Sequence, residues 1–155
     1  MSIEIKGLEE INETLTAIQA LGGNGSKLLE EYVIVPIYNK VIISFEKQSS
    51  AIDGTKWTPL SQKTLKIKQG RGKILFDSGA LQETTAWQVK DNMGFIGTNA
   101  KAKGYPYPAV HQFGVEDKTP KRPFLPINDN NELPKELQDE IERGLIKKFE
   151  KMCKK

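Results

Sequence analysis

The sequence has one cysteine, one histidine and no long apolar run. With only Cys153, an intrachain disulfide is impossible, and a reducing compartment is the simplest interpretation. Cys and His cannot together supply the three or four ligands that a zinc site needs. No apolar run approaches the roughly 20 residues that span a bilayer, and residues 1–6 alternate apolar and charged side chains, unlike a signal peptide. We therefore expect no membrane segment, no metal, no cofactor, and synthesis in a cytoplasm.

The composition of the chain is typical of a globular protein. The 155 residues are 37% hydrophobic and 28% charged, and 23 basic against 20 acidic residues give a net charge of +3. A charge this mild does not by itself indicate nucleic acid as a partner. A chain of this length can bury roughly two thirds of its unfolded surface without a disulfide or metal. We expect one domain over residues 1–155.

Three helices are predicted from the spacing of apolar residues. The first covers residues 8–21 and ends at Gly22-Gly23. The second, over residues 26–48 with Ser26 as its cap, is so apolar that we expect it to be the central buried element. Pro36 should kink or split it near Val35, and its β-branched residues make a strand the alternative for part of 33–43. The third covers residues 134–152, with acidic residues first and lysines last.

The middle of the chain, residues 53–127, is predicted to be a β-rich body with extended arms. Trp87 and Val89 alternate with polar residues, Asp91-Asn92 makes a turn, and residues 93–96 continue as a second strand, which predicts a hairpin. The fold class is therefore α+β, with a small antiparallel sheet packed against the long central helix and the C-terminal helix.

His111 is the one candidate for a catalytic base, in a small hydrolase. Such a base needs a partner that orients it or exchanges the proton with it, and no pattern in the sequence brings Cys153 to it. A packed or hydrogen-bonded structural role is the preferred interpretation, and we assign no catalytic residue.

A basic, glycine-rich stretch follows a short predicted helix that Ser61 can cap. It has no acidic residue between Asp53 and Asp77, and it lacks the Gly-Lys-Ser/Thr ending of a phosphate-binding P-loop. It is predicted to be flexible and exposed. Contact with a partner protein, contact with nucleic acid and a solvated loop all remain open for its cations, which are Lys63, Lys66, Lys68, Arg71 and Lys73.

Arg122-Pro123-Phe124-Leu125 has two interpretations. As a stiff docking arm, it could place Phe124 and Leu125 in a neighbour's pocket with Arg122 at the rim. As an extended segment up to Ile127, it could instead cross the edge of its own sheet. Trp57, Trp87 and Phe113 lack the spacing of a stacking platform and are expected in the core.

Four short motifs follow one another along the chain: Trp57-Thr58-Pro59-Leu60-Ser61, Ser78-Gly79-Ala80-Leu81, His111-Gln112-Phe113-Gly114 and Arg122-Pro123-Phe124-Leu125. Together they resemble the phage virion morphogenesis family, which includes tail completion proteins. The resemblance covers about Phe45 to Ile127. Where that family usually has Thr, this chain has Ser78, and Pro108 is inserted in its usual Tyr-Ala pair. The residues that carry the resemblance are Trp57, Pro59, Leu60, Ser61, Thr64, Lys68, Leu75, Ser78, Gly79, Leu81, Gly97, His111, Gln112, Phe113, Gly114, Arg122, Pro123 and Phe124.

The resemblance implies a structural role without enzymatic activity. Members act in tail completion or head–tail joining and are thought to form or cap a ring. The expected partners are therefore further copies of this chain and neighbouring tail or neck proteins, in a virion assembled in a bacterial host. Residues 53–73 and 103–126 are the candidate contact arms. The alternative function is a nucleic-acid-binding module that uses the basic residues of 63–73.

Overall fold

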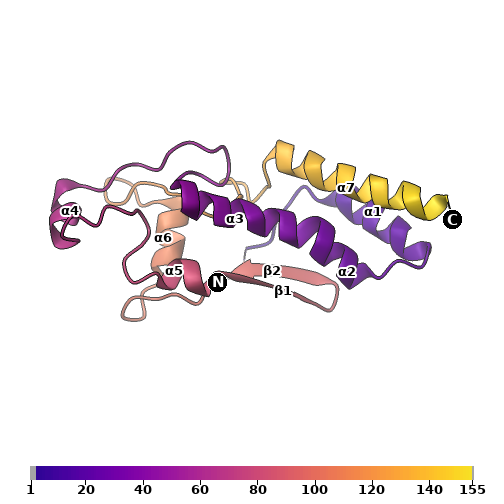
Figure 1. The fold of residues 1–155 in the computed structure, drawn as a ribbon, viewed down its shortest axis with the longest axis horizontal. Helices are drawn as coiled ribbons and strands as arrows, with labels where there is room; N and C mark the ends of the chain where they lie inside the picture. Colours follow the sequence, from indigo (N-terminus) through magenta and orange to yellow (C-terminus); the bar gives the residue numbers. More distant parts are fainter. Residues whose placement is uncertain (1–2, 155) are drawn as a thin grey trace. The chain divides into compact units, whose positions relative to one another are not determined.

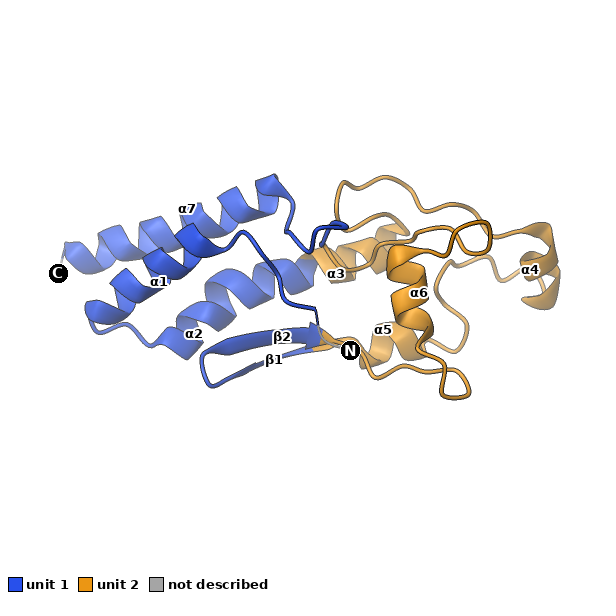
Figure 2. Ribbon diagram, turned by 180° about the vertical axis from the view of Figure 1, so that it is seen from behind, with its two compact units in different colours: residues 1–39, 87–96, 127–155 blue, residues 40–86, 97–126 orange. Residues whose placement is uncertain are grey.

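The computed structural model describes residues 3–154. The chain, for which one domain was expected, forms two compact units (Figure 2). Unit 1 contains the described residues up to Asn39, Trp87–Ile96 and those from Ile127 onward, and unit 2 contains Lys40–Ala86 and Gly97–Pro126. No helix among residues 3–154 is long and apolar enough to cross a membrane.

Two amphipathic helices form one layer of unit 1. Helix α1 (Glu9–Ala20) and helix α7 (Lys135–Cys153) pack against each other. Their apolar stripes are buried and consist of Ile11, Leu15 and Ile18 on α1 and Leu137, Ile141 and Leu145 on α7. α1 ends where Gly22 adopts a φ of +89°, a conformation that glycine takes without steric cost. Both helices lie close to their predicted bounds.

The predicted central helix is helical from residue 25 to residue 47 and contains one widened turn. It consists of α2 (Gly25–Leu29), the π-helical η1 (Glu30–Ile34) and α3 (Val35–Lys47), whose last residues belong to unit 2. The Val35 N–H donates to the Glu30 carbonyl, five residues back. This wider turn precedes Pro36, whose ring would otherwise crowd the carbonyl four residues earlier. The helix is therefore not split, and the strand alternative for residues 33–43 is wrong.

The start of this helix differs from the prediction in its cap. Asn24, rather than Ser26, accepts a hydrogen bond from the Lys27 N–H at 3.0 Å. The Ser26 hydroxyl instead donates to the Asn92 side chain at 2.9 Å, which ties the helix start to the tip of the hairpin. An Asn that precedes the helix with extended backbone is a favourable cap, and this leaves the serine for a tertiary contact.

The predicted hairpin is present and consists of β1 (Ala86–Lys90) and β2 (Met93–Gly97). Asp91 and Asn92 both have positive φ, 52° and 59°, as a two-residue type I′ turn requires. In unit 1 the α2–η1 segment lies between the hairpin and the α1/α7 layer (Figure 1). On its other side, the α2–η1 segment faces α7, which packs against α1 and η1.

Unit 2 is not β-rich, contrary to the prediction. It contains the end of α3, three short helices and long loops, with isolated bridges such as Ser49–Lys56 and Val115–Thr119. Prolines and glycines divide this part of the chain into pieces too short for a larger sheet. The fold class nevertheless remains α+β. The short helices are α4 (Gln62–Ile67), α5 (Ala80–Thr84) and α6 (Tyr107–Phe113).

Helix α6 lies in a segment that was predicted to be an extended arm. Pro106 precedes it, and Pro108 occupies its first turn. Proline is tolerated there because the first N–H groups of a helix have no partner within the helix. The Tyr-Pro-Tyr-Pro sequence therefore starts a helix and places His111 and Gln112 in its last turn.

Candidate assembly surface

All residues of the family-like motifs lie in unit 2, and several that are distant in sequence meet there. Gln112 is buried and joins α6 to the Phe124–Leu125 backbone. Its Oε1 accepts from the N–H groups of Phe124 and Leu125 at 3.0 and 2.9 Å, and its Nε2 donates to the Leu125 carbonyl at 3.1 Å. The Phe124–Leu125 segment pairs with no strand, and the Gln112 side chain forms the hydrogen bonds that a neighbouring strand would provide. Buried backbone groups without a partner would be costly.

Trp57 and Arg122 hold the same segment from another loop. The Trp57 indole N–H donates to the Pro123 carbonyl at 3.2 Å. The Arg122 guanidinium donates to the Thr58 carbonyl at 3.0 and 3.1 Å and to Pro59 at 3.4 Å. Its burial lowers the pKa of Arg122. In a docking arm, the guanidinium of Arg122 would be free to bind a partner protein. Here its N–H groups bind backbone carbonyls of the same unit, so Arg122 has a structural role and is not a contact at the rim of a partner's pocket.

Phe124 is part of the core of unit 2. It is 2% exposed and packs against Phe45, with ring centroids 5.5 Å apart. Phe45 in turn meets the edge of Trp57 at 6.1 Å, which is 4% exposed. Such aromatic contacts add to the stabilisation from burial. The docking interpretation of Phe124 is therefore wrong. The alternative was that the segment crosses the edge of its own sheet. It does pack within its own unit, but it pairs with no strand.

His111 has an environment that favours its neutral form. Burial, and then the positive charge of Arg122, lower the pKa of His111. Its ring meets the edge of Tyr107 at 6.1 Å, and its backbone carbonyl accepts from the Arg122 N–H at 2.7 Å. The buried Nδ1 has no hydrogen-bond partner among the described residues. A general base needs a group that orients it through a hydrogen bond, and no described residue forms such a bond with Nδ1.

The basic stretch is exposed, as predicted, and its backbone is bridged by hydrogen bonds from one of its own lysines. The Lys68 ammonium donates to the carbonyls of Lys73 and Phe76 at 2.9 and 2.5 Å. Ser61 caps α4 by accepting from the Thr64 N–H at 3.2 Å. The Lys68 ammonium therefore binds carbonyl groups of its own loop and does not serve as a contact with a partner. Lys63, Lys66, Arg71 and Lys73 remain exposed.

The remaining motif residues shape the backbone that follows this loop. Gly79 precedes α5 with a φ of +89°, and the Ser78 hydroxyl accepts from the Ala80 N–H at 3.3 Å. The side chain of Leu81 is 2% exposed. The backbone of Leu75 has a positive φ of +55°. The half-buried positions are Leu60, Thr64, Leu75, Phe113, Gly114 and Pro123, while Pro59, Ser61, Ser78 and Gly97 are exposed.

Exposed apolar side chains mark surfaces that the sequence analysis missed. Ile67 on α4 is 73% exposed, and Met93 and Phe95 on β2 are 57% and 50% exposed. One signal was present in the sequence, because β2 alternates Met93 and Phe95 with the inward Gly94 and Ile96. Exposed apolar side chains that group on one face of a strand are typical of interaction surfaces.

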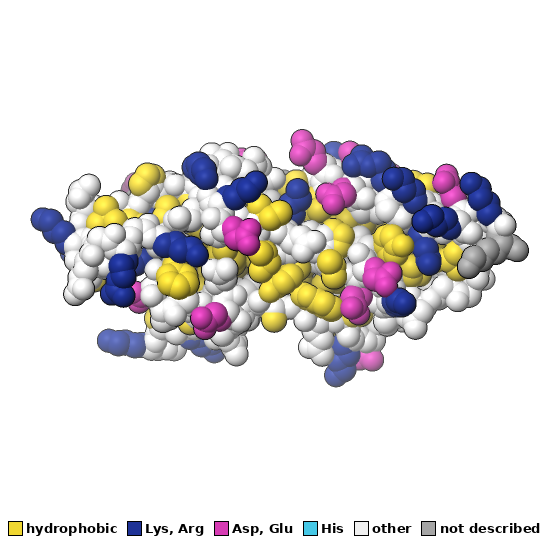
Figure 3. All heavy atoms as spheres, in the orientation of Figure 1, with side chains coloured by type: hydrophobic (Ala, Val, Ile, Leu, Met, Phe, Trp, Pro, Cys, Tyr) yellow, Lys and Arg dark blue, Asp and Glu magenta, His cyan; other side chains and the backbone are white. Residues whose placement is uncertain are grey.

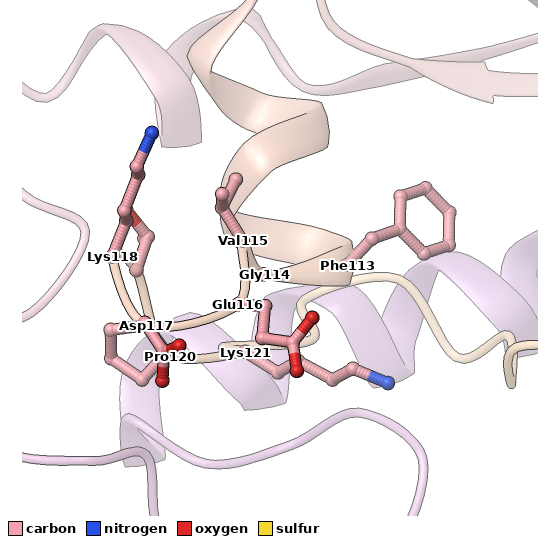
Figure 4. Close-up of a pocket in the computed structure, with 9 residues that line it drawn as sticks. Phe113, Gly114, Val115, Glu116, Asp117, Lys118, Pro120 and Lys121 are labelled. Carbon is pink, nitrogen blue, oxygen red and sulfur yellow. The ribbon is translucent and has the colours of Figure 1, made fainter.

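The loop after α6 forms an open hollow lined by Phe113–Lys121 (Figure 4). Figure 4 shows that Lys118 and Lys121 extend in opposite directions from this loop. Binding pockets for small molecules have polar groups that converge on one point, and these side chains do not. Within residues 3–154 there is also no cluster of three or more His, Cys, Asp or Glu side chains that could hold a metal.

Most of the chain, both units included, matches a known protein family. Residues 7–145 match the model of the phage virion morphogenesis family. The chain belongs to this family. Its role is therefore in the assembly of phage virions, together with other virion proteins. No curated protein and no solved structure matches the chain.

Proposed function

We propose that this protein of the phage virion morphogenesis family acts without enzymatic activity in tail completion or head–tail joining. It forms part of a ring at the tail end or neck. The observation that carries the proposal is the use of the motif side chains. Trp57, Gln112 and Arg122 all bind backbone groups of their own unit. They build a rigid body, which leaves contact with neighbours to its surface.

The exposed surface supports a ring. A ring requires a heterologous contact, in which one patch of a subunit meets a different patch of the next. The two most exposed of the large apolar side chains lie in different units, Ile67 in unit 2 and Met93, with Phe95 beside it on β2, in unit 1. Neither is buried by the described residues of its own chain.

The test is electron microscopy of lysates from an induced prophage that lacks the gene. Filled heads and tails of finished length that remain unjoined are the expected result. Complementation with the wild-type gene restores infectious particles, and mass spectrometry of purified particles should then detect the protein. Normal infectious particles from the deletion strain would refute the proposal.

A further inference from the structure

The mild net charge of the chain conceals two units of opposite sign. Unit 2 has 13 Lys and Arg against 6 Asp and Glu, a net charge of +7, whereas unit 1 has 10 against 14, a net charge of −4. Opposite net charges on two surfaces speed association and select the partner. In each unit, the charges of the prevailing sign are concentrated in one region.

In unit 1 the acidic residues gather where α1 and α7 begin. We define the acidic end as Glu9, Glu10, Glu13, Glu136 and Glu140, all of which are exposed. The chain just before α1 lies beside the chain just before α7, because the Lys6 N–H donates to the Asn131 carbonyl at 2.8 Å. A hydrogen bond from Lys135 to Asp139 at 3.0 Å raises the pKa of Lys135, and Glu142 and Glu10 raise it further. Apart from Lys135, the lysines of α7 are Lys147, Lys148 and Lys151 in its last turns, and dark blue side chains gather at that end in Figure 3.

In unit 2 the cations gather on α4 and the loop after it. We define the cationic loop as residues 62–73, with Lys63, Lys66, Arg71 and Lys73 exposed around Ile67. The two hydrogen bonds from Lys68 restrain the loop backbone, which reduces the entropy that the loop loses on docking. The affinity for phosphates comes mainly from the electrostatic attraction of cations and needs no apolar side chain. The exposed Ile67 gains nothing from phosphates, but it is suited to a protein surface.

We infer that the cationic loop of one copy contacts the acidic end of α1 and α7 in a second copy. The two surfaces are different, so the contact is heterologous and can continue from copy to copy. The inference rests on the proposed ring and adds to it which surfaces meet. The second copy is the favoured partner because its own sequence provides the opposite charge.

The test is charge reversal in the complementation strain, with the titre of infectious particles as the readout. Lys63→Glu with Lys66→Glu makes the loop acidic, and Glu136→Lys with Glu140→Lys makes the acidic end basic. Each pair alone should lower the titre by about tenfold or more, because like charges then face each other. The chain with all four changes should recover most of that loss. A second set, Arg71→Glu and Glu10→Lys, tests the same contact at other positions.

Matched controls keep the test specific. Lys101→Glu with Lys103→Glu, and Glu116→Lys with Asp117→Lys, reverse exposed charges of unit 2 outside the cationic loop and should leave the titre unchanged. Circular dichroism and urea unfolding check that each variant folds. Full titre for both single reversals overturns the inference, and so does a loss that the combined chain does not recover in either set.

These outcomes separate the inference from the proposed function, which the deletion phenotype tests. A DNA partner is also distinguished. In that case the loop reversal lowers the titre, the combined chain fails to recover it, and the wild-type protein binds a DNA duplex with an affinity that falls steeply with salt. That result would replace the second copy by nucleic acid as the partner of the cationic loop.

Discussion

The side-chain amide of Gln112 pairs with both backbone groups of Leu125, accepting from its N–H at 2.9 Å and donating to its carbonyl at 3.1 Å. A third bond reaches the Phe124 N–H at 3.0 Å. One side chain thus holds a segment that the extended backbone alone would leave unpaired. This side chain therefore has a structural role, and its loss should destabilise the fold.

Gln112→Ala should lower the free energy of unfolding by about 2 to 4 kcal/mol, because the N–H groups of Phe124 and Leu125 lose their acceptor in a buried site. Urea denaturation of the purified protein measures this change. Gln88→Ala is the matched control, since Gln88 is exposed on β1, and its midpoint should stay close to that of the wild type. Equal midpoints for the two variants would contradict the role given to Gln112.

Phe124→Ala should cost about 3 to 5 kcal/mol of stability, the usual range for removing a buried aromatic ring. The contact with Phe45 is lost and a cavity remains. Complementation should fail at high temperature and improve on cooling, as expected for a fold defect. A variant with wild-type stability that still fails to assemble would return Phe124 to the docking surface.

Gly94→Ala should destabilise the hairpin, because a Cβ at this position would lie 2.1 Å from the Ile34 Cδ1 atom. Either β2 or the Ile34 side chain must move, and overpacking of this kind costs about 1 to 3 kcal/mol. Gly97→Ala on the same strand is the control, since no atom lies within 4 Å of its Cβ. Thermal unfolding should separate the two variants, and similar midpoints would refute the contact.

Lys68→Met should open the cationic loop without unfolding the protein, because it removes the ammonium that binds the Lys73 and Phe76 carbonyls. Limited trypsin digestion followed by mass spectrometry should show faster cleavage after Arg71 and Lys73. Lys63→Met removes an exposed lysine of the same helix and should leave these rates unchanged. Equal cleavage rates in both variants would show that Lys68 does not hold the loop.

Stability should fall as the pH falls below 6.5, the ordinary pKa of histidine, because the folded state lowers the pKa of His111. Between the folded and unfolded pKa values the unfolded chain binds more protons, so acid favours unfolding. His111→Asn cannot titrate and should show a smaller loss between about pH 7.5 and about pH 5. An equal loss in wild type and variant would assign the effect to other groups.

The helices α1 and α7 could be predicted because their apolar residues recur at helical spacing over several turns. The hairpin could be predicted from Asp91-Asn92, two residues that tolerate positive φ. These signals are local, and a local signal is visible in a sequence. The widened turn before Pro36 was not predictable in form, although the proline marked its place.

The missed features depend on contacts between distant residues. Phe124 looks the same in sequence whether it enters its own core or a neighbour's pocket, and only Phe45 and Trp57 decide between these. Lys68 resembles its exposed neighbours until the carbonyls that it binds are known. Helix α6 was missed because its prolines were interpreted as signs of an extended arm rather than a helix start.

Cys153 is exposed in the last turn of α7 and is the only cysteine of the chain. A maleimide fluorophore therefore attaches at one known position without any mutation. Labelled protein incorporated into particles would lose its fluorescence in discrete steps under illumination, one step for each copy. Counting these steps particle by particle would give the number of subunits directly.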